Sequence, residues 1–418
     1  MTSDIASLAN LKIDSDRLWD SLMEMARIGA TEKGGVNRQA LTDLDKQGRD
    51  LFVDWCKQAG CTIRVDRMGN IFARRAGKDD SLAPVMTGSH LDTQPTGGKF
   101  DGVYGVLAGL EVLRTLNDLN YETQRPVEVS VWTNEEGCRF APAMVGSGVY
   151  VGKFALDFAH DIADMDGKTM GGELERIGYL GDEPMGGRDI AAFFEVHIEQ
   201  GPILEAEEKT IGVVQGAQGQ RWFDCTVTGQ EAHAGPTPMA RRRDALVGAS
   251  RIVQEINRIG HANQPYACAT VGQMEVRPNS RNTIPGQVFF SVDFRHPEDD
   301  VLSKMKSELE AFVESVRADA GLDVVLDEIW YQPPLKFNAD CVAAVGAGAE
   351  ATGLSHMNII SGAGHDACHI ATVAPTGMIF VPCEDGISHN EVENATQSDI
   401  AAGCNVLLHA IIDRANAT

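Results

Sequence analysis

The order of predicted helices and strands between residues 221 and 331 constrains the fold of this chain more than any other feature. Alternating apolar residues predict strands, and apolar residues spaced by three and four predict helices. The strand-like segments are 221–229, 267–276, 287–295 and 323–331, and the helix-like segments are 238–259 and 297–321. This β-α-β-β-α-β order describes a compact ferredoxin-like α+β domain of about 120 residues.

The segments on either side of this block alternate between strand and helix. Residues 83–90 predict a buried strand, residues 104–119 a helix with one apolar stripe, and the run from Pro126 another strand. The alternation of strand-like and helix-like segments returns at residues 362–382, and residues 397–413 predict the last helix. Alternating strands and helices indicate an α/β domain. We therefore expect a discontinuous α/β domain, 1–210 and 331–418, into which a smaller domain, 211–330, is inserted.

Charge and composition exclude several classes of partner. The 418 residues include 60 Asp and Glu but 36 Lys and Arg, a net charge of −24, and an acidic surface repels nucleic acids and anionic membranes. No apolar run approaches the roughly 18 residues that span a bilayer, and the first residues lack the features of a signal peptide. The nine cysteines are scattered without a CxxC pair, which is typical of reduced thiols. We expect a cytoplasmic protein without a nucleic-acid or membrane partner.

Candidate metal ligands recur where predicted strands end. They are His90, Glu135, Glu136, His197 and His389, together with Asp101 in a glycine-rich loop eleven residues after His90. Three imidazoles with carboxylates suit zinc, manganese, cobalt or nickel rather than calcium. A carboxylate such as Asp101 can bridge two cations, and paired cations activate one water. The adjacent glutamates divide naturally into one ligand and one general base.

Each of these residues also has a simpler interpretation. A single histidine is more often a hydrogen-bonded structural residue than a ligand, and an adjacent Glu pair is usually a solvated face. Five other histidines are therefore left unassigned: His160, His261, His356, His369 and His409. Asp92 follows His90 by two residues and could accept a hydrogen bond from the other ring nitrogen. The coincidence of several ligand types at strand ends favours the metal site.

Eight segments together resemble the amidase/hydantoinase/carbamoylase family of dinuclear metallohydrolases, which is similar in fold to zinc aminopeptidases. In chain order they are "GSHLDTQPTGGKFDGVYGV", "NEEGCRF", "EVHIEQGP", "AHAGPTPM", "RPNSRNTIPG", "DFRH", "SGAGHDA" and "ISHNE". The family includes N-carbamoyl-L-amino acid hydrolases, β-ureidopropionases and allantoate amidohydrolases. The resemblance covers nearly the whole chain.

The resemblance implies a zinc-aminopeptidase-like catalytic domain that holds two divalent transition-metal ions (Zn, Mn, Co or Ni) per subunit. His90 and His197 would complete one metal site, and Glu136 and His389 the other. Asp101 would bridge the two ions, and Glu135 would be the base. The inserted domain would be a lid through which two subunits form a homodimer.

The lid would also hold substrate-binding groups. The resemblance assigns His233 to stabilising the oxyanion, across the dimer, and Asn282 and Arg295 to binding the substrate carboxylate. An arginine fork suits this role because it meets a carboxylate with two hydrogen bonds. An ordinary ion pair between Arg295 and Asp293 is the alternative.

Two residues of the catalytic domain complete the expected site. We expect Gln200 to contact the substrate and His365 to lie behind the metal ligands.

The expected reaction is hydrolysis of the carbamoyl C–N bond of N-carbamoyl-L-amino acids to the L-amino acid, carbon dioxide and ammonia. N-carbamoyl-β-alanine and allantoate also carry a ureido group and a carboxylate, so Arg295 and Asn282 do not separate these substrates. A dipeptidase or aminoacylase remains a more remote alternative. A binding protein on this fold would predict a broken ligand set, whereas the set here is intact.

Overall fold

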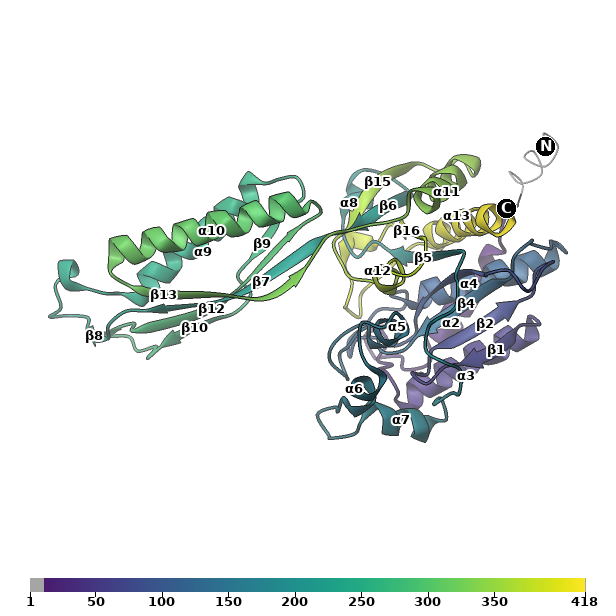
Figure 1. The fold of residues 1–418 in the computed structure, drawn as a ribbon, viewed down its shortest axis with the longest axis horizontal. Coiled ribbons are helices and arrows are strands. Elements are labelled where there is room, and N and C mark those ends of the chain that lie inside the picture. The colour runs from purple at the N-terminus through teal and green to yellow at the C-terminus, as the bar shows by residue number, and fades with distance from the viewer. Residues whose placement is uncertain (1–10, 418) are drawn as a thin grey trace. The chain divides into compact units, whose positions relative to one another are not determined.

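The computed structural model describes residues 11–417, which form two compact units (Figure 1). Unit 1 contains the described residues up to Gln215 and those from Phe337 onward, and unit 2 is Gly216–Lys336. The predicted mixture of an α/β architecture with an α+β insertion is confirmed. Each unit has its own apolar core.

Unit 1 is built on a nine-stranded sheet in the order β1-β2-β4-β3-β5-β16-β6-β14, with β15 paired to β6. The strands are β1 Thr62–Val65, β2 Ile71–Arg75, β3 Val85–His90, β4 Val127–Trp132, β5 Ala192–Ile198, β6 Ile211–Ala217, β14 Leu335–Lys336, β15 His356–Ser361 and β16 Thr376–Val381. The four neighbouring strands β4, β3, β5 and β16 run parallel. Their carboxyl ends therefore meet along one edge, which is where open α/β sheets bind ligands.

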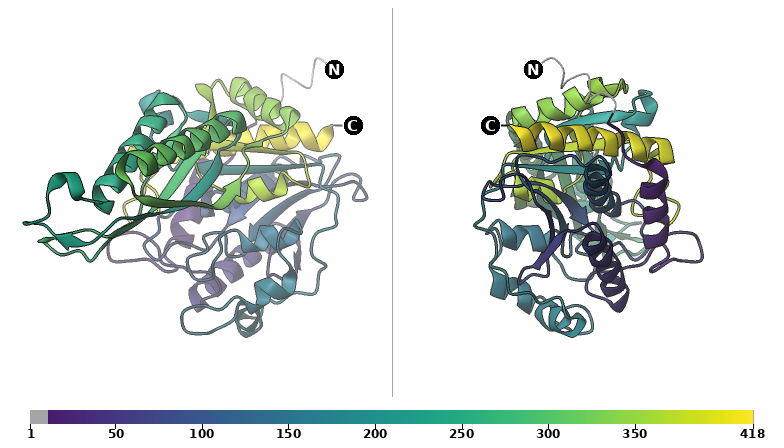
Figure 2. Two further views of the ribbon diagram at one scale, coloured as in Figure 1. Left: turned by 60° about the vertical axis from the view of Figure 1, so that its left-hand side comes forward. Right: turned by 90° about the vertical axis from the view of Figure 1, so that its right-hand side faces the viewer.

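Helices cover this sheet and connect its strands. They are α2 Ser15–Met25, α3 Asp43–Gln58, α4 Val103–Asp118, α5 Val145–Tyr150, α6 Leu156–Asp161, α7 Met170–Ile177, α8 Ile203–Ala206, α11 Ala339–Ala351, α12 Asp366–Ile370 and α13 Gln397–Asn416, with a 3₁₀ turn η2 at Glu384–Gly386. Helices α11 and α13 lie side by side (Figures 1 and 2).

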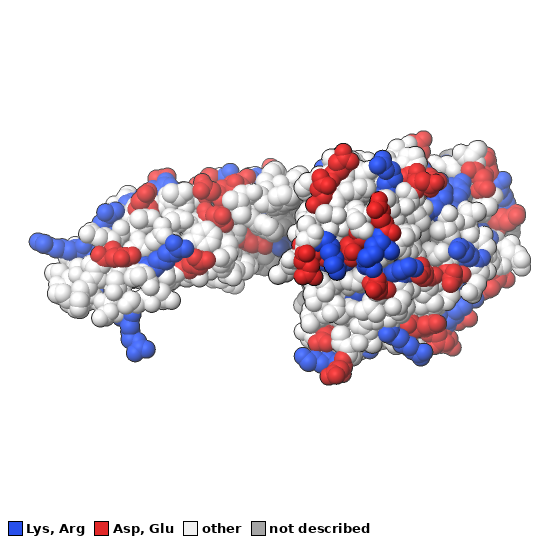
Figure 3. Space-filling model, turned by 90° about the horizontal axis from the view of Figure 1, so that it is seen from below, with Lys and Arg blue, Asp and Glu red and all other residues white. Residues whose placement is uncertain are grey.

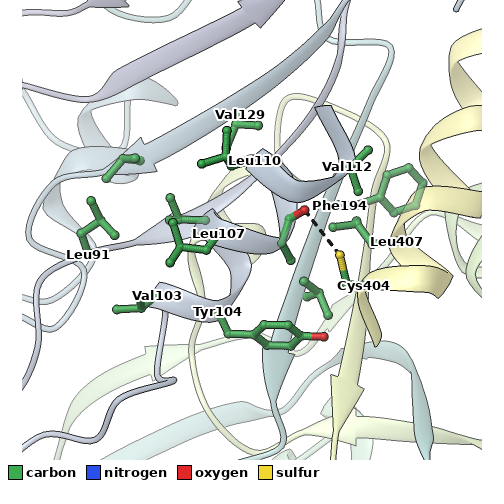
Figure 4. Close-up of a cluster of buried hydrophobic side chains, with 14 of the residues drawn as sticks. Leu91, Val103, Tyr104, Leu107, Leu110, Val112, Val129, Phe194, Cys404 and Leu407 are labelled. Atoms are coloured by element: carbon green, nitrogen blue, oxygen red, sulfur yellow. Dashed lines mark hydrogen bonds between the residues drawn. The ribbon is translucent and has the colours of Figure 1, made fainter. Parts of the chain in front are cut away.

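Helix α4 is the centre of the unit 1 core because it packs against β3, α2 and α13 at once. Its predicted apolar stripe, Val106, Leu110, Leu113 and Leu116, is fully buried. Figure 4 shows this helix packing beside Phe194 and Leu407, with the Cys404 thiol 3.5 Å from the Ala108 carbonyl. Burial of each large aliphatic side chain contributes about 1.5–3 kcal/mol. The helix thereby holds the loop that precedes it, which carries Asp101, against the sheet.

Unit 2 places two helices on one face of a five-stranded antiparallel sheet. Its elements are β7 Gly219–Thr228, β8 Ala232–His233, a 3₁₀ turn η1 Met239–Arg241, α9 Ala245–Ala262, β9 Cys268–Thr270, β10 Met274–Arg277, β11 Thr283–Ile284, β12 Gln287–His296, α10 Asp299–Ala320 and β13 Asp323–Gln332. The strand order is β10-β12-β7-β13, with β9 paired to β12. A separate two-stranded ribbon, β8 with β11, continues from β7 and β12.

Two predicted boundaries in unit 2 were wrong. The helix expected from residue 238 begins at Ala245, because the Asp244 side chain caps it by accepting hydrogen bonds from the Leu246 and Val247 N–H groups. The strand expected over 267–276 is interrupted at 271–273, so it forms the separate strands β9 and β10.

Acidic and basic side chains are interspersed on the face drawn in Figure 3. Among the helices of residues 11–417, none combines the length and the apolar character needed to cross a membrane.

Candidate metal centre

The carboxyl edge of the four parallel strands gathers the predicted metal ligands. His90 ends β3, His197 is the penultimate residue of β5, and Glu136 lies in the loop after β4. Asp101 precedes α4, and His389 lies in the loop between η2 and α13. The structure therefore brings together five residues that are spread over 300 positions of the sequence.

The two oxygens of Asp101 face different groups of ligands. Oδ1 lies 3.6 Å from His90 Nε2 and 3.2 Å from His197 Nε2. Oδ2 lies 3.4 Å from His389 Nε2, which is itself 3.4 Å from Glu136 Oε2. Each group of three offers ligand atoms within 4.8 Å of one another. The arrangement fits two cations that share one carboxylate.

Backbone carbonyls fix the orientation of the two buried imidazoles. His90 Nδ1 lies 2.8 Å from the Asp92 carbonyl, and His197 Nδ1 lies 2.9 Å from the Ile198 carbonyl. Because a carbonyl can only accept, each Nδ1 carries a hydrogen, and Nε2 is the nitrogen that each ring directs at Asp101. Nε2 is therefore the atom through which each imidazole would bind a metal.

A glycine at position 102 allows the Asp101 loop to approach His90. Gly102 has φ of +67°, and a Cβ atom there would lie 2.3 Å from the His90 ring. Only glycine combines that backbone conformation with that contact.

Asp92 supports the glutamate pair rather than His90. Its buried carboxylate accepts hydrogen bonds from the Glu135 N–H at 3.3 Å and the Glu136 N–H at 3.2 Å. The predicted bond from the His90 ring goes instead to the Asp92 carbonyl. Asp92 thus lies behind the site, where it holds the loop that carries the expected base and a ligand.

Two glutamines orient the carboxylates. The Gln94 side chain donates to Glu136 Oε2 at 2.6 Å, and its backbone N–H donates to Oε1 at 3.1 Å. The Gln200 side chain donates to Asp101 Oδ2 at 2.9 Å and to the Ser388 hydroxyl at 3.2 Å. Sequence reasoning expected a substrate contact for Gln200 and did not identify Gln94.

Burial shapes the electrostatics of the centre. It raises the pKa of Glu135 well above the usual range, although His90 opposes this effect. It also raises the pKa of Glu136 to about 8. At Asp101 burial acts in the same direction, but hydrogen bonds to His197 and His90 outweigh it and hold the pKa well below the usual range. Bound cations would offset the cost of burying these negative charges, so the donor set fits divalent metal ions.

His365 and Glu195 form a second layer beside His197. The His365 and His197 ring centroids are 4.6 Å apart, and His365 Nε2 makes no hydrogen bond within the described chain. Burial lowers the pKa of His365 well below its usual range, so the ring is neutral. Glu195 accepts hydrogen bonds from Ser89 Oγ at 2.6 Å and from the Ala367 N–H at 2.8 Å. Sequence reasoning missed Glu195, although its position two residues before His197 puts both on one face of β5.

The predicted substrate-binding residues of unit 2 fall into two places. His233 in β8 pairs with Thr283 in β11, and the Asn282 carbonyl accepts a hydrogen bond from the Ala234 N–H at 2.9 Å. His233 and Asn282 therefore share the ribbon that Figure 1 shows at one end of unit 2. Arg295 lies near the other end of β12 and forms an ion pair with Asp293 at 2.9 Å.

The fold and this donor set define an α/β protein whose site suits divalent metal ions. The model of the Peptidase family M20/M25/M40, whose enzymes are metal-dependent, matches residues 86–413. The N-carbamoyl-L-amino-acid amidohydrolase of Rhizobium meliloti is 51% identical over 97% of this chain and 98% of its own length. The allantoate amidohydrolase of Escherichia coli is 34% identical over 93% of this chain and 95% of its own length.

A solved structure is similar over almost the same length. The crystal structure of an amidase of the hydantoinase/carbamoylase family from Burkholderia multivorans has 64% sequence identity and a TM-score of 0.95, covering 97% of this chain and 99% of its own. The chain therefore belongs to the M20/M25/M40 peptidase family and, within it, to the hydantoinase/carbamoylase amidases.

Proposed function

We propose that this protein hydrolyses the carbamoyl C–N bond of N-carbamoyl-L-amino acids, giving the L-amino acid, carbon dioxide and ammonia. The observation that carries the proposal is the two-sided donor set around Asp101 in a chain that is 51% identical to an amidohydrolase of that name over nearly its whole length.

We assign His90 and His197 to one cation, Glu136 and His389 to the other, and Asp101 to both. The separate orientation of the two Asp101 oxygens supports this assignment. When bound, the two divalent ions would polarise the ureido carbonyl and make a water molecule more acidic.

Glu135 is the proposed general base. Its carboxylate lies 3.5 Å from His90 Nε2, and its backbone is held by Asp92. In this role Glu135 takes a proton from the water that attacks the ureido carbon and then returns it to the leaving amine nitrogen. Burial of Glu135 suits both steps, because a raised pKa makes a carboxylate a better base and keeps the proton available for donation.

The substrate contacts of unit 2 support a homodimer. We assign Arg295 and Asn282 to the substrate carboxylate and His233 to the oxyanion. The nine residues of β12 from Gln287 to Arg295 span about 26 Å, whereas His233 and Asn282 lie beyond the Gln287 end. A carbamoyl amino acid is far shorter than this, so we infer that Arg295 and the ribbon residues at one active site come from different subunits.

Allantoate is the second candidate substrate, because allantoate amidohydrolase of E. coli is 34% identical over 93% of this chain. The alternatives are separated by ammonia release from N-carbamoyl-L- and D-amino acids, N-carbamoyl-β-alanine and allantoate, and by release of free amino acid from a dipeptide and an N-acetyl amino acid. Each assay is run after chelation and again after addition of Mn, Co, Ni or Zn. We expect metal-dependent release, fastest from the carbamoyl-L-amino acids. Cleavage of the dipeptide or the N-acetyl compound with none of the ureido substrates would contradict the proposal.

A further inference from the structure

The loop that carries Asp101 has no regular secondary structure of its own to hold it. Its residues lie between β3 and α4, and its backbone at Phe100 and Asp101 is bound by a side chain almost 300 positions away. One oxygen of Glu393, Oε1, accepts hydrogen bonds from the Phe100 N–H at 3.0 Å and the Asp101 N–H at 3.1 Å. Both donors therefore bind the same carboxylate oxygen.

The other oxygen of Glu393 reaches the same aspartate through a serine. The Ser388 hydroxyl lies 3.0 Å from Glu393 Oε2 and 3.1 Å from Asp101 Oδ2. Glu393 therefore contacts both the backbone of Asp101 and the hydroxyl beside its carboxylate. The Glu393 side chain is buried, so solvent does not compete for these bonds.

Close packing leaves Glu393 little freedom. A Cβ atom at Gly98 would lie 2.0 Å from the Glu393 carboxyl carbon, so the Asp101 loop packs directly against the carboxylate.

Glu393 also follows His389 by four residues, and His389 is the most exposed of the five ligands, with 52% of its side chain accessible. The same residue thus joins the segment of His389 to the loop of Asp101.

We propose that Glu393 is a positioning residue. It holds Asp101 and His389 at the spacing needed to bind the cation that they share with Glu136, called the second cation below. This inference rests on the proposed function, because it concerns the same metal pair. Loss of the Glu393 carboxylate removes two hydrogen bonds between the Asp101 loop and the His389 segment and leaves the one from Ser388 to Asp101. The cation held by Asp101, Glu136 and His389 therefore binds more weakly.

The substitution Glu393→Gln distinguishes geometry from charge. The glutamine carbonyl oxygen can accept both N–H groups, and its amide can donate to Ser388, whose hydroxyl then donates to Asp101. Glu393→Ala removes the three hydrogen bonds that the Glu393 side chain makes, and leaves the bond from Ser388 to Asp101. Glu393→Asp keeps the charge in the same cavity but is one methylene too short to retain all of them. Glu391→Ala is the matched control, because Glu391 lies on the same segment and pairs only loosely, at 3.6 Å, with the exposed Lys33.

The test is calorimetric titration of the metal-free full-length variants with Mn²⁺ alone, together with electron paramagnetic resonance of the bound manganese. We expect wild type and Glu391→Ala to bind two ions with the signal of a coupled pair. Glu393→Ala and Glu393→Asp should bind the second ion at least about tenfold more weakly and lose that signal, whereas Glu393→Gln should stay within about threefold of wild type.

Two results would overturn the inference, and they differ from failure of the proposed function. Unchanged binding of both ions in Glu393→Asp contradicts the role of Glu393, even if Glu393→Ala does not fold. Equal weakening in Glu391→Ala also contradicts it. A wild-type protein that binds fewer than two ions contradicts the metal pair itself.

Discussion

Asp101 presents one carboxylate oxygen to His197 Nε2 at 3.2 Å and the other to His389 Nε2 at 3.4 Å. These two histidines come from β5 and from the loop after η2, so a single side chain links the two halves of the centre. In the proposed metal pair, Asp101 is therefore the residue on which both cation sites depend.

Asp101→Asn should therefore weaken both cations together. The amide keeps the shape of the side chain but removes the negative charge and leaves one acceptor oxygen instead of two. We expect metal affinity to fall at least about 100-fold, because even changes to groups behind metal ligands commonly cost tenfold to 100-fold. Titration with Mn²⁺ measures this. The exposed Asp385→Asn variant should bind like wild type, and retention of one tight site in Asp101→Asn would contradict a bridging role.

Glu135→Gln should separate metal binding from catalysis. The amide cannot accept the proton from water, so turnover should fall by about 10²–10⁴. Metal content should stay the same, because Glu135 is not among the assigned ligands. Ammonia release and elemental analysis on one preparation check both points, with the exposed Glu175→Gln as control. Full activity of Glu135→Gln would remove Glu135 from the mechanism.

Arg295→Lys should raise KM more than it lowers kcat. Lysine keeps the positive charge but lacks the planar fork that meets a carboxylate with two hydrogen bonds. We expect KM for N-carbamoyl-L-amino acids to rise about tenfold, which corresponds to about 1.4 kcal/mol. Arg277→Lys is the matched control, because Arg277 lies in the same sheet and is exposed. If both variants kept the wild-type KM, the ion pair with Asp293 would be the whole role of Arg295.

Acid should destabilise the protein through His369. Lys153 Nζ can only donate, and it lies 3.2 Å from His369 Nε2, so that nitrogen carries no hydrogen. Burial, reinforced by the Lys153 charge, lowers the pKa of His369 to about 4. A histidine in the unfolded chain has a pKa of about 6.5, so between these values only the unfolded chain binds the proton. The stabilisation is complete above about pH 6.5 and is lost as the pH falls toward 4.

Urea unfolding of metal-free wild type and His369→Asn at pH 7.5 and pH 5.0 checks this prediction. The free energy of unfolding of wild type should fall by about 2 kcal/mol more than that of the variant over this interval. An equal loss in the two proteins would mean that His369 is already protonated in the folded state.

The sequence predicts the parts of this molecule that depend on local pattern. Apolar runs that end in polar residues locate His90, the glutamate pair and His197, because a buried strand and its end are visible along the chain. The β-α-β-β-α-β order of unit 2 is visible for the same reason. The start of α9 could have been found from the capping residue Asp244 rather than from the helical period.

Contacts between distant segments could not be predicted. Glu393 lies in a polar loop whose sequence looks like that of any solvent-exposed loop. Only the fold brings its carboxylate within hydrogen-bond distance of the Asp101 N–H group. The partner of the Asp92 carboxylate is likewise 43 residues away, in the backbone of Glu135. Hydrogen bonds of this kind carry no periodic signal in the sequence.

The most direct test of the metal pair follows activity and occupancy together. Metal-free protein is titrated with Mn²⁺ while bound metal and ammonia release from an N-carbamoyl-L-amino acid are measured on the same samples. We expect activity to be absent without metal and to reach its maximum at two bound ions per chain. Full activity in protein that elemental analysis finds free of transition metal would contradict the account.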